Sequence, residues 1–390
     1  MKIVYYSTPS FADCDFPLIR EYQKRGIDVY FLIKLTPYNR NSTLINIKEQ
    51  IPVNGIFKFS EYAESHIFTD YLNLDKVYIV NQLNSRNFSL PSFILAWKLI
   101  WFILKLKVSV VHTTVLNDWD SLLLLFKRKL VLTLHDPFPH TGEKNVRKEF
   151  FRCLAIKYSS KIILLNQVQK QDFMDLYHVS EKRIIINRLG IYDSINVYKR
   201  NLPLKEDSVS HQKKILFFGR ISPYKGIEYL LEAMNNVHIR YPNVICTVMG
   251  SGNFYFDITE YLNLPHVKII NRFIPTDELI SAIEESTMVV CPYTDATQSG
   301  VIYTSYALYK PVIATNVGGF CESVIDSVTG MLVPPKDVKS LENAILYLLE
   351  HPEKCAQMGD EIKKNADCGL FSWDNIAEKY MNIYDMYKAY

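Results

Sequence analysis

The chain has 390 residues, of which 48% are apolar and 22% charged, and its 44 basic and 41 acidic side chains leave a formal net charge of +3. These values exclude an intrinsically disordered chain and give no electrostatic reason to expect a nucleic-acid partner. The length exceeds what one ordinary core supports, so we expect two α/β domains of similar size.

The first half of the chain alternates strand and helix patterns. They predict a strand at Ile3–Ser7, a helix at Phe16–Arg25 that Gly26 closes, and a second strand at Ile27–Ile33. Further β-rich runs, spaced by helix-length intervals, are Val77–Val80, Val108–Val111, Leu130–Leu134 and Lys161–Leu165. We therefore predict a doubly wound, Rossmann-like domain with a parallel sheet over residues 1–200. Because the first strand begins at once, without the regions of a signal peptide, we expect a cytoplasmic protein.

A segment rich in Trp, Ile, Leu and Phe extends over Phe93–Lys107 and contains Lys98, Lys105 and Lys107. These lysines argue against a transmembrane span. We favour a helix that covers the sheet and leads into the strand at Val108–Val111. A helix on the membrane surface is the alternative, so peripheral contact with the inner face of the membrane stays open.

The second half repeats the alternation after a polar, aperiodic segment at Arg200–Gln212, which predicts a linker. We expect a second Rossmann-like domain over residues 213–370 and a last helix at 371–390. Strands are predicted at Lys213–Phe218, Val244–Met249, Val267–Ile270, Met288–Cys291 and Pro311–Thr315, and helices at Thr276–Glu285, Gly300–Tyr309 and Val338–Glu350.

The loop after the strand Lys213–Phe218 carries two cations on one turn. It runs from Gly219 through Arg220 and Lys225 to Gly226, beside the start of the next helix. Ligands of open α/β sheets bind at the carboxyl ends of strands, and two fixed cations beside a helix start favour a diphosphate. A solvated basic turn is the plainer alternative.

Other strand ends in this half are also candidates for contact with an anion. One loop is small and hydroxylic and would expose backbone N–H groups at a helix start; its residues are Asp295, Thr297, Gln298, Ser299 and Gly300. An N-cap role for Ser299 would also explain this loop. Gly250 ends a second strand, and Gly318 and Gly319, followed by Glu322, permit close backbone approach at a third.

In the first half, His135 leaves the strand Leu130–Leu134 directly. An imidazole at a strand end can hydrogen-bond sugar hydroxyls or move protons, so His135 is the first catalytic candidate here, ahead of His140. We interpret His112, at the end of another strand, as structural.

No metal is expected. Asp118 and Asp120 resemble a carboxylate pair for a divalent ion, but they begin a leucine-rich helix, where Asp is a natural first-turn residue. The seven cysteines are scattered and form no C-x-x-C pair, so the sequence indicates neither a zinc site nor a disulfide framework.

The loops of the second half carry a specific resemblance. Its pieces are Phe217–Gly226, Met249–Gly252, Ala296–Val301, Lys310–Gly319 and Thr329–Pro334. Over these segments the chain resembles family 4 of the glycosyltransferases, enzymes of GT-B fold in which two Rossmann-like domains face a cleft. The first half resembles the family more weakly, in its sheet pattern and in His135-Asp136. The ending from Phe371 is similar to the family's last helix, which crosses back to the N-terminal domain.

The resemblance implies a retaining, hexosyltransferase-type enzyme that needs no metal or other cofactor. It would move a sugar from a nucleotide diphosphate sugar to a glycan or lipid-linked acceptor, in the synthesis of a surface polysaccharide. Arg220 and Lys225 would neutralise the diphosphate, and His135 would contact the sugar or the acceptor. Donor contacts would come from Gly219, Gly250, Asp295, Thr297, Gln298, Ser299, Gly300, Thr304 and Glu322.

The sequence departs from the family in two places. Family members usually carry two Glu residues separated by seven others, and alignment on Lys310-Pro311-Val312 puts Ala296 and Thr304 at these positions. Asp295 is a candidate substitute for the first Glu, and Glu322 is considered for the second. The loop Ser7–Phe11 lacks the family's usual glycine pair, so no contacts are carried over to it.

Two other functions stay open. A nucleotide-sugar 2-epimerase on the same fold also needs a diphosphate site, but it would want paired catalytic carboxylates, which the readable loops do not supply. A nucleotide-sugar sensor without catalysis would fit the missing Glu pair, whereas the two cations and His135 favour an enzyme.

Overall fold

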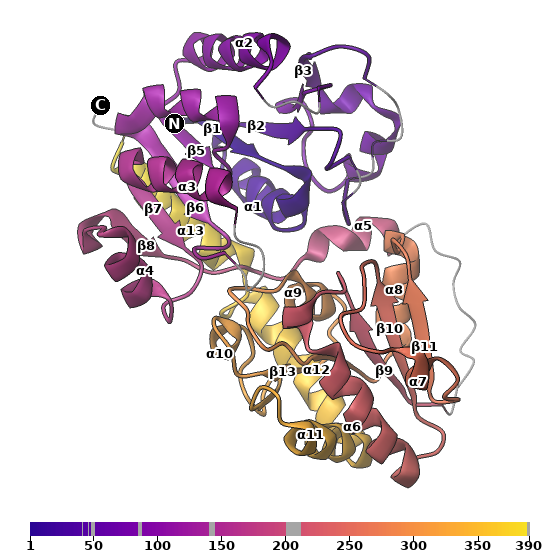
Figure 1. Ribbon diagram of the computed structural model, residues 1–390. Helices are drawn as coiled ribbons and strands as arrows, with labels where there is room; N and C mark the ends of the chain where they lie inside the picture. The colour runs from indigo at the N-terminus through magenta and orange to yellow at the C-terminus, as the bar shows by residue number, and fades with distance from the viewer. Residues whose placement is uncertain are drawn as a thin grey trace. The chain divides into compact units, whose positions relative to one another are not determined.

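The computed structural model describes residues 1–40, 42–45, 47, 51–84, 88–139, 145–199 and 212–387. These residues form two compact units (Figure 1). Unit 1 comprises the described residues of 1–139, 145–190 and 371–387, and unit 2 comprises those of 191–370. The predicted domain limit at residue 200 differs from this division, because the Tyr192 N–H donates to the Tyr303 carbonyl oxygen of unit 2 at 3.1 Å. The predicted linker lies outside the described residues, apart from Gln212.

The described part of unit 1 is built on a sheet of eight strands in the order β3-β4-β2-β1-β5-β6-β7-β8. Their bounds are β1 Lys2–Ser7, β2 Asp28–Leu35, β3 Gly55–Lys58, β4 Val77–Asn81, β5 Val110–Thr113, β6 Leu130–Leu134, β7 Lys161–Leu164 and β8 Ile184–Ile186. The six predicted strands are parallel, as expected, and β8, which was not predicted, is parallel too, while the short edge strand β3 runs antiparallel to β4. The sheet is therefore of mixed type at one edge.

Helices cover both faces of this sheet. The α-helices are α1 Ala12–Lys24, α2 Leu90–Leu106, α3 Val146–Tyr158, α4 Lys170–Tyr177 and α13 Trp373–Asp385, and the 3-10 segments are η1 Pro9–Phe11, η2 Phe59–Glu61, η3 Ala63–Phe68, η4 Asp118–Lys129 and η5 Glu181–Arg183. Val4 and Leu32 belong to the core on which α2, η4 and α3 pack. On the other face, Phe31 contacts Phe16 of α1, at 5.7 Å between ring centroids, and α1 packs against α13. Among the described residues, no helix combines the length and apolar character that crossing a bilayer requires.

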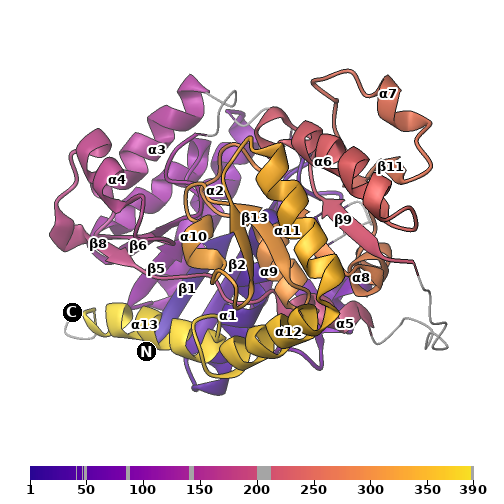
Figure 2. The same ribbon diagram turned by 90° about the horizontal axis from the view of Figure 1, so that it is seen from below.

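Unit 2 has six parallel strands in the order β11-β10-β9-β12-β13-β14 in the described chain. The strands are β9 Lys214–Phe218, β10 Ile245–Gly250, β11 Val267–Asn271, β12 Met288–Cys291, β13 Val312–Thr315 and β14 Gly330–Val333. The helices are α5 Asn196–Lys199, α6 Ile227–Arg240, α7 Thr259–Leu262, α8 Thr276–Glu285, α9 Gly300–Tyr306, α10 Phe320–Ser323, α11 Val338–Glu350 and α12 Pro352–Asp367, with 3-10 turns η6 Asp193–Ile195 and η7 Pro223–Lys225. Figure 2 shows α6 and α11 side by side over the sheet.

The strand order of unit 2 contains a topological switch point. From β9 the chain continues to β10 on one side, and it later returns to β12 on the other side of β9. Connections that leave two neighbouring strands in opposite directions open a crevice at their carboxyl ends, which is where open α/β sheets bind ligands. The loops after β9 and β12 are therefore the first place to look for a site.

Candidate active site

The loop after β9 holds its two cations in different environments. Arg220 is exposed. Lys225 is only 8% exposed, and its Nζ lies 3.8 Å from the ring centroid of Tyr293, in the loop after β12. An ammonium over an aromatic face is attracted by the ring quadrupole, which partly offsets the loss of water around it. The positive charge of Lys225 is thereby held at the switch point.

The loops after β9 and β12 are in direct backbone contact. The Thr294 N–H donates to the Tyr224 carbonyl oxygen at 2.8 Å. Gly226 has φ +63°, and a Cβ at this position would overlap the carbonyl oxygen of Pro292. Only glycine satisfies both the left-handed backbone and the close approach. The predicted basic loop and the predicted hydroxylic loop thus belong to one site.

The end of β10 joins the same site. Gly250 has φ +154°, and a Cβ there would overlap the carbonyl oxygen of Gly219. The Gly219 N–H donates to the Met249 carbonyl oxygen, and the Ile221 N–H donates to that of Ser251, both at 2.9 Å. Gly219 and Gly250, both candidates from the sequence, therefore lie where two strand-end loops approach each other closely.

Ser299 of the hydroxylic loop lies at the start of helix α9. It occupies the N-cap position that the sequence suggested, although its side chain makes no cap hydrogen bond in the described chain. Its Oγ lies 3.2 Å from the hydroxyl of the fully buried Tyr293. The N-cap position is therefore confirmed, while the serine hydroxyl pairs with the tyrosine and not with the helix start. At the next position, a Cβ on Gly300 would lie 3.1 Å from the ring of Tyr192, which covers this helix start.

The remaining donor candidates lie on or beside α9 and α10. Gln298 accepts a hydrogen bond from Ser323 of α10 at 3.3 Å, which ties the loop after β12 to the helix that carries Glu322. Asp295 and Glu322 are partly buried. Thr297 of the loop and Thr304 inside α9 are both buried, at 4% exposed.

In unit 1, His135 follows β6 and stacks on Phe11, with 3.8 Å between ring centroids and 9° between planes. Burial lowers the pKa of His135 to about 4, against the opposing effect of Asp136. Its Nε2 is buried and has no hydrogen-bond partner among the described residues. A cavity of about 250 Å³ lies beside it, lined also by Thr114 and Arg152. A neutral imidazole with an unpaired nitrogen beside a cavity is suited to a substrate hydroxyl.

The other histidines named from the sequence have different places. His112 is fully buried, and its Nε2 lies 2.7 Å from Thr133 Oγ1, while its Nδ1 pairs with the Tyr384 hydroxyl of α13. Burial lowers the pKa of His112 to about 3, so it stays neutral and structural. His140 lies outside the described residues.

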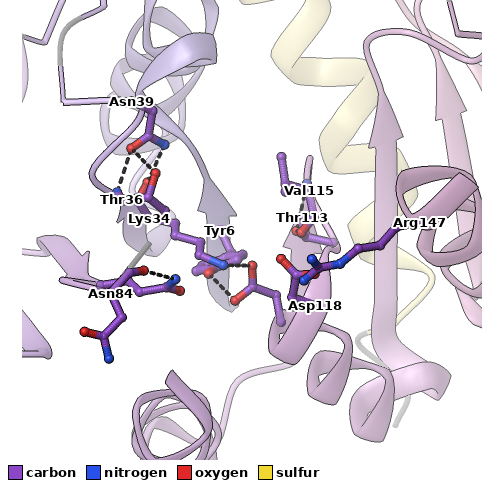
Figure 3. Close-up of polar contacts among 11 residues, drawn as sticks. Tyr6, Lys34, Thr36, Asn39, Asn84, Thr113, Val115, Asp118 and Arg147 are labelled. Carbon is purple, nitrogen blue, oxygen red and sulfur yellow. Dashed lines mark hydrogen bonds and ion pairs between the residues drawn. The ribbon is translucent and has the colours of Figure 1, made fainter. Parts of the chain in front are cut away.

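The two aspartates of η4 are each engaged by a cation of the protein (Figure 3). Asp118 pairs with Arg147. Asp120 pairs with Lys34 and accepts a hydrogen bond from the Tyr6 hydroxyl at 2.9 Å. Lys34 and Asp120 are 8% and 6% exposed, so this ion pair is buried. Their present partners use the carboxylates that a metal would need.

Another group has mixed metal-ligand chemistry. Cys14, Asp15 and His135 each place one ligand atom within 4.8 Å of the others. Asp15 accepts a hydrogen bond from the Tyr5 hydroxyl at 2.8 Å, and burial raises its pKa to about 7. Sulfur, oxygen and nitrogen together would suit a transition ion. The expectation that the reaction needs no metal stays a prediction.

Several tyrosines pack around the loops after β9 and β12, and the sequence did not indicate them as part of the site. Tyr293 lies under Lys225 and beside Phe320, at 5.1 Å between ring centroids, and Tyr303 pairs with Ser323 at 2.9 Å. Tyr192 comes from the segment that precedes the linker. The position of Tyr293 just after a strand was an available signal, whereas the role of Tyr192 depends on long-range packing.

Comparisons with known proteins give a family match in unit 2. The model of the glycosyl transferases group 1 family matches residues 199–365, which cover most of unit 2. An uncharacterised glycosyltransferase of Methanocaldococcus jannaschii is 26% identical over 268 residues, which are 67% of this chain and 70% of that protein. Across eight curated relatives, all glycosyltransferases by name, the aligned part spans 42% to 70% of the relative's length.

Solved structures share the fold across nearly the whole chain. The Anabaena protein HepE, in complex with UDP-glucose, has a TM-score of 0.66 at 18% identity and covers 99% of this chain and 100% of its own. The UDP-GlcNAc 2-epimerase of Neisseria meningitidis, bound to UDP-GlcNAc, has a TM-score of 0.59 at 15% identity, with 98% and 100% covered. The fold is therefore GT-B, and fold alone does not separate transferase from epimerase.

Proposed function

We propose that this chain, a glycosyltransferase of GT-B fold whose residues 199–365 match the group 1 transferases, moves a sugar from a nucleotide diphosphate sugar to a glycan or lipid-linked acceptor. The observation that carries this proposal is the contact between the loops after β9 and β12. It holds Lys225 on Tyr293 at the switch point of the sheet, with Arg220 on the same turn.

In this proposal the two cations act on the leaving group. As the glycosidic bond breaks, negative charge grows on the diphosphate, and fixed positive charges stabilise that state more than the ground state. Arg220 can bind phosphate oxygens with two parallel N–H groups, whereas Lys225 supplies a buried point charge. Positive charge from the protein takes the place that a metal would have, so we propose a metal-independent reaction.

The donor sugar needs partners other than the usual Glu pair. Asp295, in the loop after β12, and Glu322, on α10, are the acidic candidates. The hydrogen bond from Ser323 to Gln298 links α10 to that loop, so the two carboxylates belong to connected segments. We propose that His135 binds a hydroxyl of the sugar or the acceptor through its unpaired Nε2, and that the sugar keeps its anomeric configuration.

We further propose that the enzyme acts in the cytoplasm, at the inner face of the membrane, in the synthesis of a surface polysaccharide. None of the seven cysteines, all of which lie within the described residues, forms a disulfide bond, which suits a reducing compartment. A lipid-linked acceptor would be presented at that face.

A 2-epimerase is a second candidate because unit 1 holds two carboxyl groups that titrate near neutral pH. Burial raises the pKa of Asp13 and that of Asp15 to about 7, and both lie at the start of α1. Such groups can accept and donate protons at physiological pH. Analysis of the donor by NMR separates the functions: a change of configuration at C2 would identify the epimerase, and release of free sugar would identify slow transfer to water.

The test is a panel of nucleotide diphosphate sugars, with UDP among the free nucleotides, measured by thermal stabilisation and by donor hydrolysis. We expect one donor class to raise the melting temperature, by the equivalent of about 2.7 kcal/mol at 100 times Kd. Arg220→Ala should lose this effect and lower kcat/KM by about tenfold or more.

Arg240→Ala is the matched control, because Arg240 is also an exposed arginine of unit 2 and pairs with Glu350 at 3.0 Å, at the far end of α6. This variant should bind donor as the wild type does. Stabilisation by no donor, or equal behaviour of the two variants, would contradict the proposed site.

A further inference from the structure

Helix α2 has two apolar faces, and only one of them is covered by unit 1. Leu95, Leu99 and Ile103 are at most 4% exposed and belong to the core of the unit. The sheet-covering helix expected from the sequence accounts for this face. Figure 1 shows α2 along the outside of the unit, and the large side chains of its second face are exposed.

The second face is a continuous stripe of large side chains. Its residues recur at intervals of four and three, as one side of a helix requires, and their exposed fractions are Leu90 70%, Ile94 47%, Trp97 46%, Trp101 60% and Leu104 58%. Single exposed apolar residues are ordinary, but a contiguous row with two tryptophans marks a surface that binds something.

The apolar surface continues beyond α2. Phe88, 52% exposed, lies 5.2 Å from Trp119 of η4 and 6.1 Å from Phe151 of α3, measured between ring centroids. On α3, Phe150 is 58% exposed and packs on Phe151. The guanidinium of Arg147 lies 4.6 Å above the Phe88 ring. These contacts extend the aromatic surface from α2 toward α3 and place one cation, Arg147, on it.

The exposed charges of the chain segment that carries the stripe are basic. Between residues 88 and 129 the basic side chains are Lys98, Lys105, Lys107, Lys127, Arg128 and Lys129. The acidic ones are Asp118 and Asp120, which are 6% exposed and engaged by Arg147 and Lys34. Lys105 places its Nζ 3.3 Å above the Trp101 ring, so cation and apolar stripe are adjacent. A partner that fits this surface therefore has an apolar interior and a negatively charged surface.

We propose that α2 docks in the plane of an anionic lipid bilayer, with Trp97 and Trp101 among the headgroups and the lysines on the phosphates. Tryptophan suits the boundary between water and lipid, and long lysine side chains reach from an apolar face to the headgroups. A second copy of the chain fits less well, because a two-fold contact would bring the same cations together. This inference is independent of glycosyl transfer.

The test is flotation of the full chain with vesicles of phosphatidylglycerol and phosphatidylcholine in equal parts, and with phosphatidylcholine alone. We expect binding to the anionic vesicles, weakened by salt, and a blue shift of tryptophan fluorescence. Trp97→Ser/Trp101→Ser should weaken binding by about tenfold or more. Lys98→Glu/Lys105→Glu should weaken it by at least about 25-fold, since each basic residue contributes about fivefold.

Ile239→Ser/Leu262→Ser is the matched control, because these residues are 80% and 54% exposed on unit 2. It should bind vesicles as the wild type does, and circular dichroism should show all variants folded. Three results would overturn the proposal: no binding of the wild type to anionic vesicles, equal binding by the Trp97→Ser/Trp101→Ser variant, or a wild-type dimer that this variant disrupts while vesicles stay unbound.

Discussion

The contact between Gly226 and Pro292 makes the proposed donor site sensitive to one methyl group. Gly226→Ala places a Cβ where the carbonyl oxygen of Pro292 lies, on a residue with φ +63°. A left-handed conformation costs a non-glycine residue about 1–2 kcal/mol. Displacing a packed backbone group adds about 1–3 kcal/mol. We therefore expect the free energy of unfolding to fall by about 2–5 kcal/mol.

A control for the backbone term exists in the same chain. Gly26 has φ +69°, and a Cβ there would have no atom within 4 Å. Gly26→Ala should therefore cost only the conformational part, about 1–2 kcal/mol. Urea unfolding followed by circular dichroism measures both variants. The difference between their losses of unfolding free energy gives the part that is due to the close approach of the two loops.

The same pair of variants tests whether the contact serves binding. The turn that Gly226 ends carries Lys225, so Gly226→Ala should lose the thermal stabilisation by whichever donor class stabilises the wild type. Gly26→Ala should keep it. Equal losses of stability in the two variants, or full stabilisation of Gly226→Ala by that donor class, would refute this account of how the site is built.

Two further predictions concern buried charge in unit 1. Asp120→Asn leaves Lys34, which is 8% exposed, without its counter-ion, and should lower the free energy of unfolding by about 3–5 kcal/mol. The double variant Lys34→Met/Asp120→Leu should recover most of this loss. Urea unfolding measures both, and an Asp120→Asn variant as stable as the wild type would contradict the prediction. Because burial raises the pKa of Asp15 from 3.8 to about 7, the native state keeps a proton that the unfolded chain releases, so this carboxyl reduces stability as pH rises between these values. Asp15→Asn should therefore gain stability over the wild type from pH 5 to pH 8, and the exposed Asp172→Asn should not; a difference independent of pH would refute the assignment.

Elements with strong local patterns were predicted well from the sequence. The strands Leu130–Leu134 and Met288–Cys291 and the helices Thr276–Glu285 and Val338–Glu350 have the predicted bounds. In each of these elements, the pattern of apolar residues and the residues at the two ends indicate the same bounds. The antiparallel strand β3 was missed, because it begins with a glycine and ends with a lysine, so only two apolar residues mark it, whereas Met288–Cys291 is apolar throughout.

The candidate site was predictable in its loops but not in its assembly. The cations of the loop after β9 follow from residue type and position. Their contact with the loop after β12 depends on strand order, which pairs β9 with β12 across a long stretch of sequence. Ser299 lies at the N-cap of α9, as its local preference favours, but the pairing of its hydroxyl with Tyr293 is a contact that this preference does not predict.

The composition of unit 1 has a consequence for synthesis on the ribosome. Its helix α13 comes from the end of the chain, and Tyr384 hydrogen-bonds to Tyr22 at 3.0 Å and to His112. Residues 191–370, which make up unit 2, emerge before α13 does. At about 5–20 residues per second, these 180 residues take about 9–36 s. During that interval the face of the sheet that α13 covers is open to chaperones. Unit 2 can therefore complete its fold before unit 1, although most of unit 1 is translated earlier.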